Sequence, residues 1–232
     1  MRVLCACEES QVVTTEFRRG GHEAYSCDLL PTSGMHPEWH IQADALEVVK
    51  RGWDMVLAFP PCTHLAVSGA AWFDEKRRDG RQDMAVGFFK AFTALDHVPR
   101  VAIENPVGVM STIYRKPDQI IQPYMFGEPY TKKTCLWLKG LPPLVPTDIL
   151  EQPEGGWVNM QLTDGKYTGY GKTWGGQRED GSYRRYCDPE LKRIRSKTFR
   201  GIAVAMATQW GSGIGEAQTK IEFGGETCGQ DC

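Results

Sequence analysis

The stretch RVLCACEESQVVTTEFRRGGHEAYSCD, residues 2–28, decides the fold class because it indicates a strand, a helix and a strand in succession. The apolar run at residues 2–7 predicts a short buried strand. Ser10 is placed to cap a helix, which a Gly-Gly pair ends. Residues 23–27 predict a second strand, and Asp28 closes it.

The same alternation continues to about residue 105. Residues 53–58 (WDMVLA) and 100–103 (RVAI) predict two more strands, and residues 83–95 carry an apolar stripe at helical spacing. Residues 31–40 are expected to form a loop. Strands that alternate with helices are typical of an α/β fold, so we predict a parallel sheet with helices on both faces.

The composition changes after residue 139, where Gly, Tyr, Trp and basic residues become frequent and apolar periodicity fades. Residues 198–210 (TFRGIAVAMATQW) again predict a helix. We therefore predict an α/β domain made of residues 1–139 and 196–212, interrupted by a small insertion at residues 140–195. Residues 213–232 are expected to form a loose tail.

The overall composition bounds the function. The chain has 232 residues and a mass of 26.0 kDa, which suits one domain with an insertion. Its formal net charge of -2 provides no global attraction to nucleic acid, so DNA binding would need local basic patches. No apolar run is long enough for a membrane span and no export signal is visible, which predicts a cytoplasmic protein.

The cysteines are expected to be free thiols in a reducing compartment. The sequence has 8 of them, scattered and without a C-x2-C pair. Cys228 and Cys232 form a lone C-x3-C pair in a Gly-rich tail, and we predict no metal site.

Acidic residues follow successive predicted strands. In open α/β sheets, ligands bind beyond the carboxyl ends of the strands. Asp28 is well placed there to bind a ribose hydroxyl, and Asp44 to hold an amine or a base edge. Each acid alone is more often a loop cap or a solvated charge, but together they favour a nucleoside-containing cofactor.

The strongest single motif is FPPCTH, residues 59–64. Two prolines fix the backbone, so Cys62 is presented rigidly just past a strand. A lone cysteine after a strand is usually structural, but a thiolate is also the most competent nucleophile among ordinary side chains.

A second motif, AIENPVG, places Glu104 and Asn105 at the end of the next strand. A simple turn before a proline would explain it equally well. In a closed cleft, however, Glu104 would be protonated and could donate to a ring nitrogen. A cysteine and such a glutamate facing one cleft suit cytosine: thiolate addition at C6, assisted by a proton at N3, makes C5 nucleophilic toward an electrophilic methyl group.

This ordered set of motifs resembles the DNA cytosine-5 methyltransferase family, most nearly its short phage and prophage variants. FPPC resembles the family's nucleophile motif, IENP its Glu-Asn-Val motif, and SKTFRGIAVAMATQW its final helix. The resemblance covers most of residues 1–210 and implies an S-adenosylmethionine-dependent methyltransferase, Rossmann-like sheet with a small target-recognition insertion. The family's glycines are absent from the segment ACEES at residues 6–10.

The resemblance also implies which residues bind S-adenosylmethionine. They lie in VLCAC with the following helix start, in YSCDL, in QADAL, in the Pro-Pro pair and in the final helix: Ala6, Cys7, Ser10, Asp28, Leu29, Asp44, Ala45, Pro60, Pro61, Gly201 and Ile202. For catalysis it implies Cys62, Glu104 and Asn105. The segment TKKTCLWL stands in place of an arginine motif, and either Lys132 or Lys133 could reach the base.

Double-stranded DNA is the expected partner, bound by a monomer. Residues 166–186 (KYTGYGKTWGGQREDGSYRRY) alternate aromatic and basic side chains, a pattern that can follow phosphates and pack on sugars or bases, although a solvated loop would look similar. Residues 63–73 resemble the family's mobile loop after the nucleophile. The predicted DNA-binding residues are Ser68, Lys172, Arg178, Arg184, Arg185 and Lys197.

Three alternatives remain open at this stage. A thymidylate-synthase-like enzyme would also use Pro-Pro-Cys, but Thr63 separates the cysteine from the histidine. An amino-directed DNA methyltransferase would carry an aromatic residue where Cys62 stands. A non-catalytic DNA-binding relative would fit the missing glycines. A zinc deaminase is excluded, because no His-x-Glu is followed by Pro-Cys-x2-Cys.

Overall fold

One mixed sheet organises the molecule. The computed structural model describes residues 1–151, 158–159 and 194–212. The sheet has seven strands in the order β3-β2-β1-β4-β5-β8-β6. The first five in this order are parallel, whereas β8 runs antiparallel to both β5 and β6. The strands are β1 (Arg2–Ala6), β2 (Glu23–Asp28), β3 (His40–Gln42), β4 (Met55–Ala58), β5 (Arg100–Pro106), β6 (Gln119–Ile121) and β8 (Thr134–Lys139).

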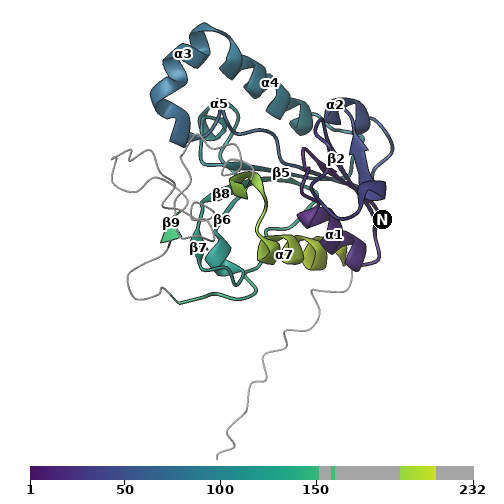
Figure 1. Ribbon diagram of the computed structural model, residues 1–232. Coiled ribbons are helices and arrows are strands. Elements are labelled where there is room, and N and C mark those ends of the chain that lie inside the picture. The colour runs from purple at the N-terminus through teal and green to yellow at the C-terminus, as the bar shows by residue number, and fades with distance from the viewer. Residues whose placement is uncertain (152–157, 160–193, 213–232) are drawn as a thin grey trace, which may run out of the picture.

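Helices cover both faces of this sheet (Figure 1). On one face, α1 and α7 pack with the side chains of Val3, Met55 and Leu57. On the other face, α2 and α4 pack with Leu4 and Val56. The helices are α1 (Val12–Arg19), α2 (Ala45–Val48), α3 (Phe73–Arg78), α4 (Arg81–Thr93), α5 (Met110–Ile113) and α7 (Arg200–Gly211). The predicted α/β, Rossmann-like sheet is thus confirmed, with one antiparallel strand added.

Shorter elements connect these layers. Three 3-10 helices lie at η1 (Pro37–Trp39), η2 (Val67–Trp72) and η3 (Pro123–Met125). The strand β7 (Tyr130–Thr131) pairs in parallel with β9 (Val158–Asn159). The predicted loop at residues 31–40 therefore contains η1 and leads directly into β3, which the local sequence pattern did not indicate.

The start of α1 differs from the prediction. Gln11, with a left-handed φ of 59°, is the residue that precedes the helix, and Ser10 makes no capping bond. The cap is the buried Glu8, whose carboxylate accepts hydrogen bonds from the backbone N–H of Val13 at 2.6 Å and of Thr14 at 3.2 Å. A carboxylate is a stronger acceptor than a hydroxyl for these unpaired amides, so Glu8 takes the role expected of Ser10.

The first residues of the predicted insertion pack on the body of the molecule. Leu144 belongs to the core beside α7, and its backbone exchanges two hydrogen bonds with the Gln119 side chain in β6. The α7 helix also packs closely against the backbone at Phe126: a Cβ on Gly201 would lie 1.9 Å from the carbonyl oxygen of Phe126. Only glycine allows this contact at the second residue of α7. The division into domain, insertion and tail stays a prediction.

Candidate active site

The carboxyl ends of the parallel strands meet at one edge of the sheet, and they carry most of the predicted site residues. Ala6 of β1 is the register partner of Cys27 in β2 and of Ala58 in β4. Because β8 is antiparallel, its beginning lies at this same edge, where Thr134 pairs with Pro106 of β5. The edge therefore gathers residues that are far apart in the sequence.

The loop that follows β4 is held in place by β5. The side-chain amide of Asn105 is buried and its Nδ2 donates a hydrogen bond of 2.7 Å to the carbonyl of Pro60. After the loop turns, the carbonyl of Cys62 accepts two hydrogen bonds of 2.9 Å from the backbone N–H groups of Leu65 and Ala66. Cys62 is thus fixed from both sides and stays partly exposed.

The next residues of this loop bind the segment after β5. Ala66 and Gly108 form an antiparallel bridge, and the N–H of Val109 donates to the carbonyl of Leu65 at 2.9 Å. A Cβ on Gly108 would lie 2.1 Å from that carbonyl oxygen, so this close approach requires glycine. The sequence resembles a mobile loop at residues 63–73. Residues 65 and 66 of this range are hydrogen-bonded to the segment after β5, and the mobility of the whole range stays a prediction.

Lys132 lies close enough to Cys62 and Glu104 to influence the ionisation of both groups. Burial raises the pKa of the Cys62 thiol, Lys132 lowers it and Glu104 raises it again, while Arg195 lowers it further. Burial also raises the pKa of Glu104, which the Lys132 ammonium and the Thr134 hydroxyl partly counteract. The structure therefore brings together the thiol and the carboxyl group that the sequence predicted for one cleft.

The two candidate lysines have different surroundings. Lys133 is exposed, whereas Lys132 is partly buried and its Nζ donates a hydrogen bond of 3.4 Å to the carbonyl of Arg195. The charge of Lys132 acts on both Cys62 and Glu104. Of the two lysines, Lys132 is thus the one whose charge acts on the candidate nucleophile, and its contact with a base stays a prediction.

A second group of residues surrounds the end of β1. Cys7 has a left-handed φ of 61°, a conformation that glycine adopts more readily. Burial raises the pKa of its thiol, and the carboxylate of Asp28, the thiol of Cys27 and the carboxylate of Asp44 raise it further. Asp28 and Asp44 therefore both lie near Cys7, and their role in cofactor binding stays a prediction.

Both acids of this group also have a local structural role. Asp28 Oδ1 accepts a hydrogen bond of 2.9 Å from the N–H of Leu30, and Asp44 Oδ1 caps α2 through the N–H of Leu46 at 2.9 Å. Each carboxylate keeps its second oxygen for other partners. Leu29, which directly follows Asp28 in the sequence, is 71% exposed and offers apolar surface next to it.

The remaining predicted residues are placed as follows. Ala6, Ala45, Pro60 and Ile202 are buried, and Pro61 is exposed. The backbone N–H of Gly201 donates to Glu128 Oε1 at 3.2 Å. Ser10 is partly buried, Ser68 belongs to η2, and the backbone N–H of Lys197 donates to the carbonyl of Ile194. Four predicted DNA-binding residues lie outside the described ranges: Lys172, Arg178, Arg184 and Arg185.

Sequence reasoning missed four residues that shape this edge. Glu8 caps α1, Lys76 and Gln82 contact the loop after Cys62, and Arg195 acts on the thiol. In the sequence, Arg195 is marked only as the last residue of the predicted insertion. An acid four residues before a helix was the one available signal, and it pointed to Glu8.

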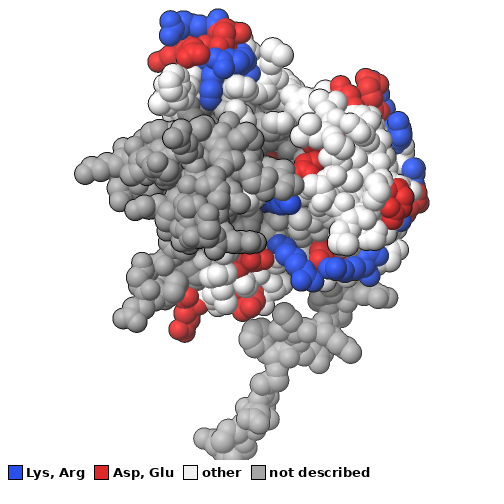
Figure 2. All heavy atoms as spheres, viewed as in Figure 1, with Lys and Arg blue, Asp and Glu red and all other residues white. Residues whose placement is uncertain are grey.

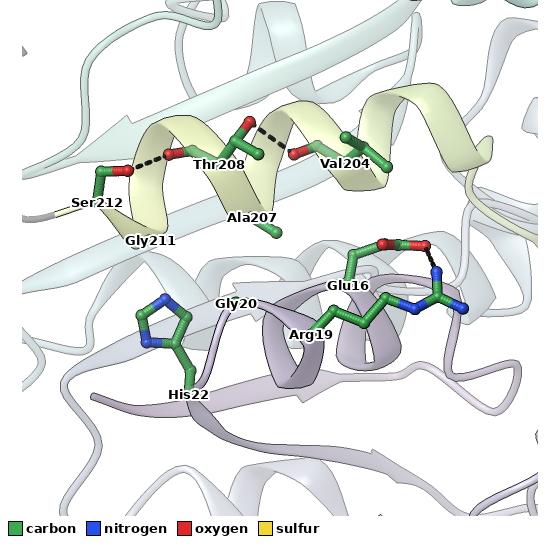
Figure 3. A pocket seen from close by; sticks show the side chains of 9 residues that line it. All are labelled: Glu16, Arg19, Gly20, His22, Val204, Ala207, Thr208, Gly211 and Ser212. Atoms are coloured by element: carbon green, nitrogen blue, oxygen red, sulfur yellow. Dashed lines mark hydrogen bonds and ion pairs between the residues drawn. The ribbon is translucent and has the colours of Figure 1, made fainter.

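The described part of the chain also has a groove that lies elsewhere. It runs between α1 and α7, has a volume of about 380 Å³ and is lined by Glu16, Arg19, His22 and Thr208 among others (Figure 3). None of the predicted site residues lines it.

Basic and acidic side chains are mixed on the surface, most plainly over α3, so this view shows no patch of a single charge sign there (Figure 2).

Neither a membrane-spanning helix nor a metal-binding cluster is present among the described residues. No helix among them has the length and apolar character needed to cross a bilayer. No group of three or more His, Cys, Asp or Glu side chains in those ranges is arranged to hold a metal ion.

Comparison with known proteins gives only distant structural likeness. No protein-family model and no curated protein matches the chain. A candidate DNA modification methyltransferase encoded within an E. coli prophage is 14% identical with a TM-score of 0.44, covering 66% of this chain and 52% of its own. A mutant of Spodoptera frugiperda DNMT2 is 14% identical with a TM-score of 0.40, covering 66% and 55%. The match therefore spans about half the length of each neighbour, and the fold assignment rests on the sheet order described above.

Proposed function

We propose that this protein is a DNA cytosine-5 methyltransferase that uses Cys62 as a covalent nucleophile. The observation that carries the proposal is the convergence of Cys62, Glu104 and Lys132 at the carboxyl edge of the sheet. Methylation at C5 of cytosine needs a nucleophile at C6 and a proton donor at N3, and this edge offers one of each.

The ionisation of the two groups suits that division of labour. Burial raises the pKa of Glu104 above its ordinary value, which favours the protonated carboxyl group that can donate to N3. The Lys132 charge opposes the effect of burial on Cys62 and favours the thiolate, which is the attacking species. The Cys62 sulfur forms a bond to C6, and the electron pair of the C5–C6 double bond moves toward C5. After methylation, the C5 proton is lost to solvent, the electron pair of that bond restores the C5–C6 double bond and the C6–S bond breaks to release the thiolate. N3 then returns its proton to Glu104.

The residues at the ends of β1 and β2 fit S-adenosylmethionine as the cofactor. The free carboxylate oxygen of Asp28 can accept from ribose hydroxyls, and Asp44 together with the exposed Leu29 offers a polar and an apolar contact for the adenine. When bound, S-adenosylmethionine supplies an electrophilic methyl group. Glu8 holds the turn between β1 and α1, so it fixes the backbone against which the cofactor would lie.

Duplex DNA is the substrate that we propose, bound by a monomer through the basic and aromatic insertion. Phosphate contacts from Arg and Lys would supply affinity that a net charge of -2 does not. The target cytosine must leave the base stack, since C6 is not accessible to a thiolate within a duplex.

A trapping experiment tests the function. Duplexes of random sequence with 5-fluorocytosine in place of cytosine are incubated with the protein and S-adenosylmethionine, because fluorine at C5 blocks the final elimination. We expect a covalent band on a denaturing gel for the wild type and for the control Cys228→Ala, and none for Cys62→Ala. A band that persists in Cys62→Ala would overturn the assignment. Bisulfite sequencing of DNA from expressing cells then reports the sequence context.

A further inference from the structure

Two side chains from a helical hairpin hold the two carbonyl groups that directly follow Cys62. Lys76 of α3 donates a hydrogen bond of 2.8 Å from Nζ to the carbonyl of Thr63. Gln82, in the first turn of α4, donates one of 3.1 Å from Nε2 to the carbonyl of His64. Consecutive carbonyls of the candidate nucleophile loop therefore each have a side-chain donor.

Both donors are buried, which is unusual for their residue types. Lys76 is 7% exposed and Gln82 is 3% exposed. Lysine is almost never this buried without a partner, because removing an ammonium from water is costly. In the described part of the chain the partners of Lys76 are the Thr63 carbonyl and the ring of Phe73, with the ammonium 5.7 Å from the ring centre. No carboxylate in those ranges forms an ion pair with it.

The neighbours of Lys76 on α3 behave differently. Arg77 and Arg78 are exposed, and Arg77 forms an ion pair of 2.6 Å with Asp74. The run Lys76-Arg77-Arg78 thus sends one cation inward to the loop and two outward to solvent. This contrast indicates that Lys76 serves to bind the loop and is not part of a solvated basic surface.

The hydrogen bonds act on the backbone and not on the charge of the thiol. The charged groups that shift the ionisation of Cys62 in the described ranges are Lys132, Glu104 and Arg195. On the other side of Cys62, the loop is held by the Asn105 amide at Pro60. Lys76 of α3 and Gln82 of α4 hold the part of the loop that follows Cys62.

We propose that Lys76 and Gln82 are positioning residues that hold the Cys62 loop in the geometry needed for attack on C6. This inference rests on the function proposed above. A misplacement of about 1 Å at a reacting group can cost on the order of a hundredfold in rate. If the carbonyls of Thr63 and His64 lost their donors, the Cys62 thiol would therefore attack slowly although every residue of the site is still present.

The test compares Lys76→Met with Lys76→Arg and with the matched control Arg77→Met. Methionine keeps the length and apolar body of the side chain but donates no hydrogen bond, whereas arginine retains a donor. With 5-fluorocytosine duplexes, we expect adduct formation to slow at least tenfold in Lys76→Met, on the order of what loop misplacement costs. We expect Lys76→Arg to recover most of the rate, Arg77→Met to match the wild type, and the KM for S-adenosylmethionine to stay within about twofold in all of them.

Two further readouts separate positioning from a general loss of structure. Hydrogen exchange at Leu65 and Ala66, whose N–H groups bond to the Cys62 carbonyl, should rise in Lys76→Met and not in Arg77→Met. The pH midpoint of Cys62 alkylation by iodoacetamide, followed by peptide mass spectrometry, should stay unchanged. Gln82→Leu should reproduce the slowed adduct and the faster exchange if Lys76→Met does not fold.

The outcomes distinguish this inference from the proposed function. Equal adduct rates and equal exchange in Lys76→Met, Gln82→Leu and wild type would overturn the positioning role. If the wild-type protein forms no adduct with any duplex, the proposed function fails. Hydrogen exchange at residues 65–66 then still shows whether the two side chains hold the loop.

Discussion

The amide of Asn105 donates a hydrogen bond to the carbonyl of Pro60, and this single contact ties the strand that carries Glu104 to the loop that carries Cys62. Because the Asn105 side chain is buried, water cannot replace the bond when it is lost. The relative position of the candidate acid and the candidate nucleophile therefore depends on an amide that need not touch the base.

We expect Asn105→Leu to lower the free energy of unfolding by about 1–3 kcal/mol, since it leaves the Pro60 carbonyl without a donor. It should also slow adduct formation with 5-fluorocytosine DNA. Gln119→Leu is the matched control, because Gln119 makes a comparable amide bond of 2.6 Å to the Leu144 carbonyl away from the site. Urea denaturation and gel assays measure both effects. An equal loss of adduct rate in the two variants would show that stability alone is responsible.

The Lys132 charge should be visible in the pH dependence of Cys62. Lys132 lowers the pKa of both Cys62 and Glu104, so Lys132→Met should raise both values. The thiolate then forms at higher pH, and iodoacetamide alkylation of Cys62 should show a midpoint shifted upward. The pH optimum of methylation should move in the same direction. Lys133→Met, which removes an exposed neighbour, serves as the comparison; a shift there and not in Lys132→Met would reverse our choice between the two lysines.

Asp28→Ala should weaken S-adenosylmethionine binding by about 1.5–3 kcal/mol, the range for lost hydrogen bonds to a charged group. Isothermal titration calorimetry measures this directly in the absence of DNA. Glu47→Ala removes an exposed acid from α2 and should leave the affinity unchanged. Unchanged affinity in Asp28→Ala would remove this residue from the cofactor site.

Glu8 should contribute to stability in a pH-dependent way. Burial raises its pKa, so the folded protein binds more protons than the unfolded chain between the ordinary glutamate value and the folded value. Stability should consequently fall as the pH rises through that window, and Glu8→Gln should remove this slope. Glu8→Ala should cost about 2 kcal/mol below this pH window, because Val13 and Thr14 lose their acceptor, and the cost should be smaller above the window. Thermal denaturation across pH, with exposed Glu23→Gln as the reference, provides the measurement.

The insertion should bind DNA mainly through charge. Replacing both Arg184 and Arg185 by Ala should weaken binding and reduce the slope of log K against log salt by about two, one unit for each lost phosphate contact. Lys50→Ala with Arg51→Ala removes the same charge from another exposed site and should leave the slope unchanged. Fluorescence anisotropy at several salt concentrations measures the slope for both double variants and the wild type. A slope in the arginine double variant equal to that of the wild type would show that these two arginines do not contact DNA.

The sequence predicted the alternating elements and their order, because each strand and helix carries its own periodicity. It predicted less well where a distant strand decides the outcome. Glu104 and Asn105 were expected to follow a strand that ended at Ile103, yet they belong to β5, because β8 pairs with them from about thirty residues away. No local pattern contains that pairing.

The candidate site shows the same limit. Cys62 and Asp28 were accessible to sequence reasoning because a motif or a strand end marks them. Lys132 and Lys133 are adjacent and chemically alike, and only the path of the chain between β7 and β8 turns one inward. Lys76 lies in a run of charges that looks solvated, and its burial depends on where α3 packs.

The packing of α7 also has a consequence for synthesis on the ribosome. Trp210, Met206 and Ile202 complete the core on the α1 side of the sheet, yet they are made after every strand of that sheet. Until they emerge, the nascent chain presents a bare apolar face, because its covering helix does not yet exist. A chain that stops before α7 should therefore aggregate or recruit chaperones rather than accumulate as a folded fragment.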